Sequence, residues 1–261
     1  MKKGIFKLFA VIMALGLIFS LAACSGTADE TTEPSTTEPP VVSKTPQPKS
    51  SGEAVAYFNK VMDAVKTGKP AVSPEVKKNV GSIETDNSKL KAAIPTIKKY
   101  MLNTDADSAA YGDDLTNIFP VKGQTWGSKL TIGDVRYASC LEALKTYEIT
   151  IRFKDEKDPM PLTSAIGKAY DIVDKASILK EFEKAADYIK VDKLDLVYSG
   201  CYILCSVDRA TDQVLSVTYI LNVNADSTVT GTGSLQDMGT VPLALKYDSR
   251  ITYTLDWTKP E

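Results

Sequence analysis

The chain of 261 residues contains four cysteines (Cys24, Cys140, Cys201 and Cys205) and no histidine. Cysteine thiols can be acylated, can form disulfides and can bind metal ions, so these positions carry most of the chemistry that the sequence offers. The lack of histidine removes the commonest general base, the commonest zinc ligand and every Ser-His or Cys-His nucleophile pair. Catalysis would have to use carboxylates, Lys or Tyr, and we therefore predict that the protein is not an enzyme.

Cys24 ends a short leader in which a basic start is followed by an apolar run. The first seven residues contain three lysines, Lys2, Lys3 and Lys7. Residues 8–19 carry no polar side chain, but this run is too short to span a bilayer comfortably. The residues Leu21-Ala22-Ala23-Cys24 resemble the lipobox of bacterial lipoproteins. The resemblance implies that residues 1–23 are a cleaved signal peptide and that Cys24 becomes an N-terminus carrying diacylglycerol. It also implies a lipid anchor on the extracytoplasmic face of the cell membrane, and no other cofactor is expected.

The other three cysteines could form at most one disulfide with one another. Cys201 and Cys205 lie on one predicted strand, where four residues span about 13 Å, so they cannot pair without breaking the strand. Cys140 could pair with either of them if their strands are neighbours. The favoured alternative is three buried, inert thiols, because a domain of this size does not need a covalent crosslink. No Cys-x-x-Cys pair is present, so the cysteines do not indicate a metal site.

One acidic stretch has a spacing related to that of calcium-binding loops. Asn103, Asp105, Asp107 and Asp114 fall at positions 1, 3, 5 and 12 of an EF-hand-like loop. The loop has Asn at position 1, Ser108 where the motif needs Gly, and Asp at position 12 in place of the longer Glu. A solvated acidic loop is therefore the default interpretation, with calcium binding by these four residues as the weaker alternative.

Trp126 is the one aromatic residue that the sequence pattern does not assign to a core. It lies in a loop, next to Gly127, whereas Tyr147, Tyr219 and Tyr253 share the phase of aliphatic neighbours on predicted strands. An aromatic side chain on a loop can stack against a sugar ring or line an apolar pocket. Trp126 is therefore the candidate ligand-binding residue.

Composition separates a tether from a folded part. Residues 24–52 contain five prolines among Thr, Ser and Glu and few large apolar residues, which predicts a disordered tether. Residues 53–261 remain as a single domain, large enough to bury its own core. Loss of the signal peptide lowers the formal net charge from −2 to −5, because three lysines leave with it. This acidic balance, without a basic cluster, argues against nucleic acid as a partner.

The order of predicted elements favours an α+β fold. A capping box at residues 50–53 begins an amphipathic helix that Gly68 and Pro70 end, and a second helix is predicted over residues 88–102. A third helical stretch runs to about residue 190, and Gly133 suggests a β-bulge. Each strand shows one apolar and one polar face, which is typical of an antiparallel sheet with helices on one face. We expect that sheet to be curved, and its strands are predicted within residues 130–153, 194–207, 214–223, 241–247 and 251–257.

A short repeat favours two related halves within this domain. The pattern Asp-x-x-Tyr-x-x-Cys occurs at residues 134–140 and again at residues 195–201. Two halves, 53–160 and 161–261, placed side by side in one sheet would explain it. Coincidence is the alternative, since only three positions match.

These observations predict a lipid-anchored extracytoplasmic binding protein that is not catalytic. Its expected partners are the membrane, through the lipid, and a cell-envelope, glycan or lipid ligand that the sequence does not identify. An alternative is a carrier of lipid or another apolar ligand in a cavity between sheet and helix, because residues 194–207 are apolar on both faces. A second alternative is a glycan-active enzyme that uses carboxylates alone.

Overall fold

The computed structural model describes residues 41–102, 106–172, 174–183 and 186–261. These residues form an eight-stranded antiparallel sheet with three α-helices and two 3-10 helices, so the fold is α+β with strands in the majority. Among the helices of these residues, none has the length and apolar character needed to cross a membrane.

The first helix, α2 (Ser51–Gly68), begins where the sequence predicts. The Ser50 hydroxyl accepts a hydrogen bond from the Glu53 N–H, and the Glu53 carboxylate accepts one from the Ser50 N–H, which confirms the capping box. The helix ends at Lys69, which adopts a left-handed conformation with φ 50°. Gly68 has a second role, since a Cβ there would lie 2.5 Å from the Trp257 ring.

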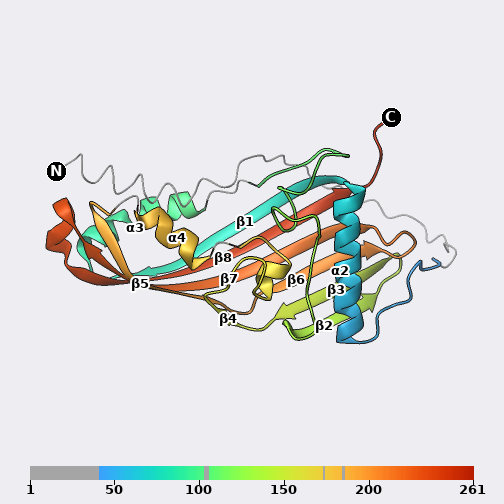
Figure 1. The fold of residues 1–261 in the computed structure, drawn as a ribbon, viewed down its shortest axis with the longest axis horizontal. Helices are drawn as coiled ribbons and strands as arrows, with labels where there is room; N and C mark the ends of the chain where they lie inside the picture. Colours follow the sequence, from blue (N-terminus) through green and yellow to red (C-terminus); the bar gives the residue numbers. More distant parts are fainter. Residues whose placement is uncertain (1–40, 103–105, 173, 184–185) are drawn as a thin grey trace, which may run out of the picture.

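Long strands dominate the molecule and run most of its length (Figure 1). The central strand β7 pairs with β8 along its whole length, with β6 along its first half and with β5 along its second half. The order across the sheet is β1-β8-β7-β6-β3-β2, and β1 and β2 lie at opposite edges, so the sheet is open. The strands are β1 (Ala71–Glu84), β2 (Val135–Glu142), β3 (Thr146–Phe153), β4 (Glu156–Lys157), β5 (Ile189–Tyr198), β6 (Tyr202–Asp208), β7 (Val214–Gly231) and β8 (Thr240–Asp256).

The helices occupy the two ends of this sheet. Helix α2 crosses β2, β3 and β7 near one end, whereas α3 (Ser88–Met101) lies beside β1 and α4 (Lys175–Glu183) beside β5 toward the other (Figure 1). The 3-10 helix η1 (Ile166–Lys168) precedes α4, and η2 (Gly233–Met238) connects β7 to β8.

Several predicted strand boundaries are wrong. The sequence does not predict β1, because its charged residues and Pro74 are not typical of a strand. Proline is tolerated there because β1 is an edge strand. Residues 194–207 form two strands rather than one, because the chain turns at Gly200 with φ 63°. Residues 241–257, predicted as two strands, form one strand that pairs with β7 without interruption. The bulge expected at Gly133 lies instead between Val135 and Tyr137.

The strands of the two proposed halves are interleaved. Of the first half, β1 lies at one edge of the sheet and β2 and β3 at the other, and they flank β6, β7 and β8 of the second half. The repeated patterns lie on β2 and β5, which do not pair. The strands of the two halves are therefore not grouped side by side in the sheet, and the relation between the two patterns stays a prediction.

The main core is formed by α2 and alternate residues of the strands. The predicted core residues Tyr147, Tyr219 and Tyr253 are at most 4% exposed. A ladder of register partners crosses the buried face of the sheet, and it consists of Cys140, Ile149, Cys205, Val217 and Tyr253. A smaller cluster at the far end contains Leu90, Ile189, Val229 and Met238.

Candidate functional site

Residues 43–49, here called the strap, lie against the folded domain. The backbone N–H of Lys44 donates to the Arg209 carbonyl at 2.7 Å, and the Gln47 side chain donates to the Cys140 carbonyl at 2.9 Å. The Tyr147 hydroxyl donates to the Thr45 carbonyl at 3.0 Å. Residues 43–49 thus contact the domain, whereas the sequence predicts that they belong to a disordered tether of residues 24–52.

Asp212 is the centre of the strap contacts. Its carboxylate accepts hydrogen bonds from the Thr45 hydroxyl at 2.6 Å, the Tyr57 hydroxyl at 2.7 Å and Lys60 Nζ at 2.9 Å. The Asp212 side chain is 6% exposed, and the Lys60 side chain is 58% exposed. Burial opposes ionisation of Asp212, but the hydrogen bonds from Thr45, Lys60 and Tyr57 outweigh it and lower the pKa of Asp212. The ionised carboxylate therefore ties the strap to α2 and to the turn between β6 and β7.

A pocket of about 240 Å³ lies beside these contacts. Its cations already have acceptors, because Lys44 Nζ donates to the Thr211 carbonyl at 2.9 Å and Lys60 Nζ to Asp212. The Trp257 indole N–H donates to the Val214 carbonyl at 2.7 Å. These polar groups bind one another, so the pocket is best explained as part of the strap attachment. Its lining consists of Lys44, Lys60, Val61, Ala64, Thr211, Asp212, Gln213 and Trp257.

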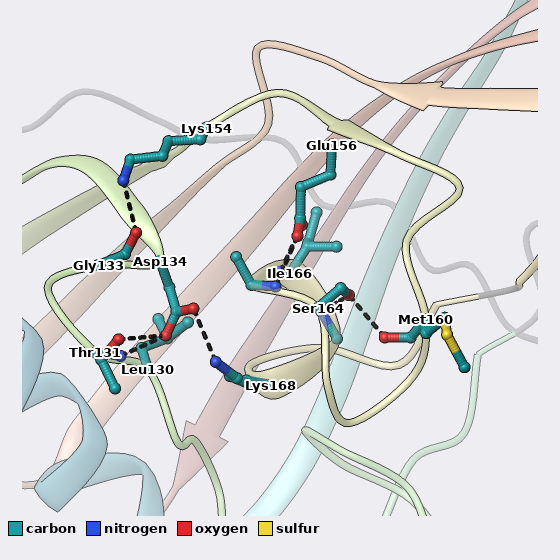
Figure 2. Close-up of polar contacts among 12 residues, drawn as sticks. Leu130, Thr131, Gly133, Asp134, Lys154, Glu156, Met160, Ser164, Ile166 and Lys168 are labelled. Carbon is teal, nitrogen blue, oxygen red and sulfur yellow. Dashed lines mark hydrogen bonds and ion pairs between the residues drawn. The ribbon is translucent and has the colours of Figure 1, made fainter.

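Two carboxylates fix the loops near η1 (Figure 2). Asp134 accepts hydrogen bonds from the N–H and hydroxyl of Thr131, both at 2.7 Å, and from Lys168 Nζ at 2.8 Å. Burial opposes ionisation of Asp134, but the donors on Lys168 and Thr131 prevail and lower its pKa. Glu156 accepts from the backbone N–H groups of residues 165 and 166 at 2.8 and 3.0 Å. An ionised Asp134 is unsuited to act as a general acid, and both carboxylates hold loop backbone.

The structure places two of the four calcium candidates. Asp107 forms an ion pair with Lys122 at 3.1 Å, and Asp114 accepts two hydrogen bonds from Thr116. Asn103 and Asp105 lie outside the described residues. Among the residues that are described, no group of three or more acidic, histidine or cysteine side chains is arranged to hold a metal ion. Calcium binding by this loop stays a prediction.

Trp126 is half-buried in a loop that is pinned to α2. The neighbouring Gly127 donates its N–H to the Asp63 carboxylate at 2.7 Å, and a Cβ at Gly127 would lie 2.1 Å from the Met62 carbonyl oxygen. Lys129 Nζ lies 4.6 Å from the centre of the Trp126 ring. The Trp126 ring therefore already makes a cation–π contact with Lys129, and binding of a ligand by Trp126 stays a prediction.

Three of the cysteines are buried free thiols, and Cys24 lies outside the described residues. Cys140 and Cys205 flank the same partner, Ile149, so two strand spacings of about 4.8 Å separate them. That exceeds the Cα separation of about 7 Å that a disulfide tolerates. Burial raises the pKa of Cys140 and of Cys201 to about 11, and it also raises that of Cys205.

The face of the sheet opposite the core ladder carries a continuous row of side chains, here called the open-face row. Its members are register partners, one from each of six strands, so they lie side by side across the sheet. Tyr137 is 51% exposed, and Lys77, Arg152 and Arg250 are exposed. In order from β1 to β2, the row consists of Lys77, Arg250, Ile220, Tyr202, Arg152 and Tyr137.

The open-face row is cationic and contains no carboxylate. The guanidinium of Arg152 lies 5.2 Å from the centre of the Tyr202 ring, which orients it over an aromatic face. Lys77 forms an ion pair with Glu75 of the adjacent row at 2.7 Å, whereas the ion pairs of the described residues do not include Arg152 or Arg250. Arg250 lies near enough to Glu75 for its charge to help lower the pKa of that carboxyl, after the larger effect of Lys77, but it forms no ion pair among the described residues. Both guanidinium groups on this face can therefore bind an anionic partner, although the chain as a whole is acidic.

Sequence reasoning missed both the strap and the open-face row. The row depends on strand order and register, which join residues as distant in sequence as Lys77 and Arg250. The alternation of polar residues on each strand predicts an exposed face but not which residues are neighbours on it.

Comparison of the chain with family models, with curated proteins and with solved structures gives no match.

Proposed function

We propose that this chain is a lipid-anchored extracytoplasmic binding protein that is not catalytic and that engages an envelope partner with the open face of its sheet. The observation that carries the proposal is the contrast between the two faces. One face supplies the core ladder, and the other exposes aromatic, apolar and cationic side chains. Leu204, at the centre of the open face, is 37% exposed, and Leu141 on β2 is 66% exposed. Exposed apolar side chains grouped with cations are typical of an interaction surface.

The proposal includes the placement of all three helices on the covered face. Side chains alternate along β7, and its pairing with β8 has no bulge, so its odd-numbered residues share one face. Val217 and Tyr219 belong to the main core, and Val229 belongs to the cluster that contains Leu90 of the α3 region. This shared phase supports helices on one face only, which leaves the opposite face to a partner.

The attachment of the strap supports an anchored protein. With Cys24 lipidated, residues 25–42 would be the only spacer between the membrane and the strap. At about 3 Å per residue in an extended Pro-rich segment, this spacer reaches about 55 Å. The strap would then direct the end of the sheet that holds the β6–β7 turn toward the membrane, while the distal end extends into the envelope.

A filled interior favours this proposal over a lipid carrier. Phe58, Met62, Phe119 and Tyr219 are at most 1% exposed, and they belong to the one buried cluster that α2 and the sheet share. The Tyr219 ring stacks on Tyr170 with ring centres 4.3 Å apart. A cavity that holds a lipid needs several hundred Å³ of free volume. Tightly packed side chains leave less free volume in this core, which favours surface binding over a lipid carrier.

The test is sedimentation of the mature chain with isolated cell-envelope fragments, using Cys24→Ser to remove the lipid. We expect the lipid-free chain to sediment with the fragments and Leu204→Glu on the open face to abolish this. Leu162→Glu, in the loop after β4, is the matched control, since Leu162 is 41% exposed. Equal sedimentation of both variants, or none by the parent chain, contradicts the proposal.

Native mass spectrometry of the same chain separates the carrier alternative. Purified without detergent from cells that supply lipid, the protein is expected to show the bare polypeptide mass. Adducts that solvent releases as lipid would establish the carrier function in place of surface binding.

A further inference from the structure

We propose that the open-face row binds an anionic glycan chain of the cell envelope, lying across the strands. This inference rests on the proposed function and names the chemistry of its partner. It follows from the composition of the row, from its line across the sheet and from the carboxylates that flank it.

The row has the length and the spacing to follow an extended polymer. Neighbouring strands are about 4.8 Å apart, so the five spacings from Lys77 to Tyr137 extend over about 24 Å. Arg250 and Arg152 lie three strands apart, about 14 Å from each other, with Ile220 and Tyr202 between them. Two guanidinium groups at that separation can each bind a phosphate or carboxylate group on successive units of one chain.

The aromatic residues favour a glycan over a plain polyanion. Tyr202 and Tyr137 stand on either side of Arg152 as its register partners. Tyrosine rings beside charged groups can pack on the apolar faces of sugar rings while their hydroxyls bind sugar hydroxyls. Because Arg152 lies over Tyr202, Tyr137 is the ring that can pack on a sugar, and Arg152 between the two rings can reach an acidic substituent of that sugar.

The flanking rows favour a chain over a flat anionic surface. The row on one side contains Glu75, and the row on the other side contains Asp248 with Asn79 and Asn222. A flat bilayer of anionic lipid headgroups would contact these carboxylates as well as the cations, and the carboxylates would repel it. A single polymer chain that lies along the row from Arg250 to Tyr137 meets fewer of them, because Glu75 is already paired with Lys77 at the end of the row. The geometry therefore matches a linear anionic ligand.

The experiment measures binding of the lipid-free mature chain to three probes. They are Gram-positive sacculi that carry phosphodiester polymer, the same sacculi stripped of that polymer with acid, and vesicles of phosphatidylglycerol. We expect binding to the intact sacculi, a loss of about tenfold or more on stripping, and weak binding to the vesicles. Binding to intact sacculi should also weaken as salt rises, because it depends on exposed charges.

The row variants give the second arm. Arg152→Gln with Arg250→Gln should weaken binding to intact sacculi about tenfold or more, and Tyr202→Leu should weaken it further than the loss of a hydroxyl alone in Tyr202→Phe. Lys89→Gln with Lys91→Gln on α3 removes the same charge elsewhere and should change binding less than twofold.

Each outcome decides the proposal. Unchanged binding by the double arginine variant overturns the row as the site. Equal binding to intact and stripped sacculi overturns the anionic ligand but leaves an envelope-binding protein, whereas loss of all sacculus and envelope binding removes the proposed function as well. Stronger binding to vesicles than to sacculi assigns the face to lipid and overturns the glycan.

Discussion

Replacing Asp212 by Asn tests whether an ionised carboxylate holds the strap on the domain. Asp212 has φ 61°, a left-handed conformation that Asn tolerates well, so the substitution preserves the turn while removing the charge. One amide oxygen can still accept from Tyr57, but the amide nitrogen replaces the oxygen that accepts from Thr45 and Lys60. The variant therefore breaks two charge-assisted hydrogen bonds and leaves the third.

The magnitude follows from the exposure of the two donors. A hydrogen bond to a charged group contributes about 1.5–3 kcal/mol, but Lys60 is mostly exposed and can return to water at little cost. The half-buried Thr45 hydroxyl accounts for most of the loss, and we expect about 2 kcal/mol in total. For a domain of this size that corresponds to a fall in Tm of about 4–8 °C.

Two assays check this expectation. Amide hydrogen exchange should become faster at Lys44 in Asp212→Asn, because the strap opens locally before the domain unfolds. The stability difference from the parent should also shrink at acid pH. The pKa of Asp212 is lowered in the folded state, so its contribution is complete above the ordinary carboxyl pKa of about 3.9 and disappears as pH falls through the folded value.

Asp208→Asn is the control on the same turn. Asp208 accepts from the Thr211 N–H and hydroxyl but from no strap residue among those described. We expect normal exchange at Lys44 in this control. Unchanged exchange and unchanged Tm in Asp212→Asn, or equal effects of the two variants, would refute the role assigned to Asp212.

Three further predictions follow from the lipid anchor and from buried titratable groups. Cys24→Ser should abolish incorporation of labelled fatty acid and move the protein from the membrane fraction to the medium. Lys66→Met removes three hydrogen bonds from Lys66 Nζ to backbone carbonyls of the 115–121 loop and should lower stability by about 2 kcal/mol in chemical denaturation. Burial lowers the pKa of Lys66 to about 8, so the unfolded chain holds this proton more tightly, and the free energy of unfolding should rise between about pH 8 and the ordinary value of 10.5 in the parent but not in Lys66→Met. In the native protein, Cys140, Cys201 and Cys205 should not react with a thiol reagent at pH 8, and all three should react after denaturation.

The sequence predicts well whatever depends on short-range patterns. The capping box of α2 and the alternation of β3 are local features, and both are found where the sequence places them. The core tyrosines follow from the same alternation, because side-chain phase along a strand decides burial when one face is covered. The α+β class follows from the order of such elements.

The rest depends on contacts between distant residues. β1 is rich in charge and contains Pro74, and it becomes a strand because β8 offers it a partner along an edge. The strap is polar and Pro-rich, yet Arg209 and Asp212 on one turn supply the hydrogen bonds that order it. The interleaved order of the strands could not be predicted from the sequence either, because strand order depends on contacts between distant segments.

The strap and the open-face row should act independently, although both belong to the same sheet. Along β6, Tyr202 of the row lies six positions, about 20 Å, from Asp208 beside the Asp212 turn, and the nearest strap contact, from Gln47 to the Cys140 carbonyl, lies three positions, about 10 Å, from Tyr137 on β2. Sites that far apart without shared partners usually contribute additively. Asp212→Asn should therefore leave the affinity of the lipid-free chain for sacculi unchanged, while Arg152→Gln with Arg250→Gln leaves the exchange at Lys44 unchanged. The strap would then determine how the domain is presented from the membrane, and the row what it binds there.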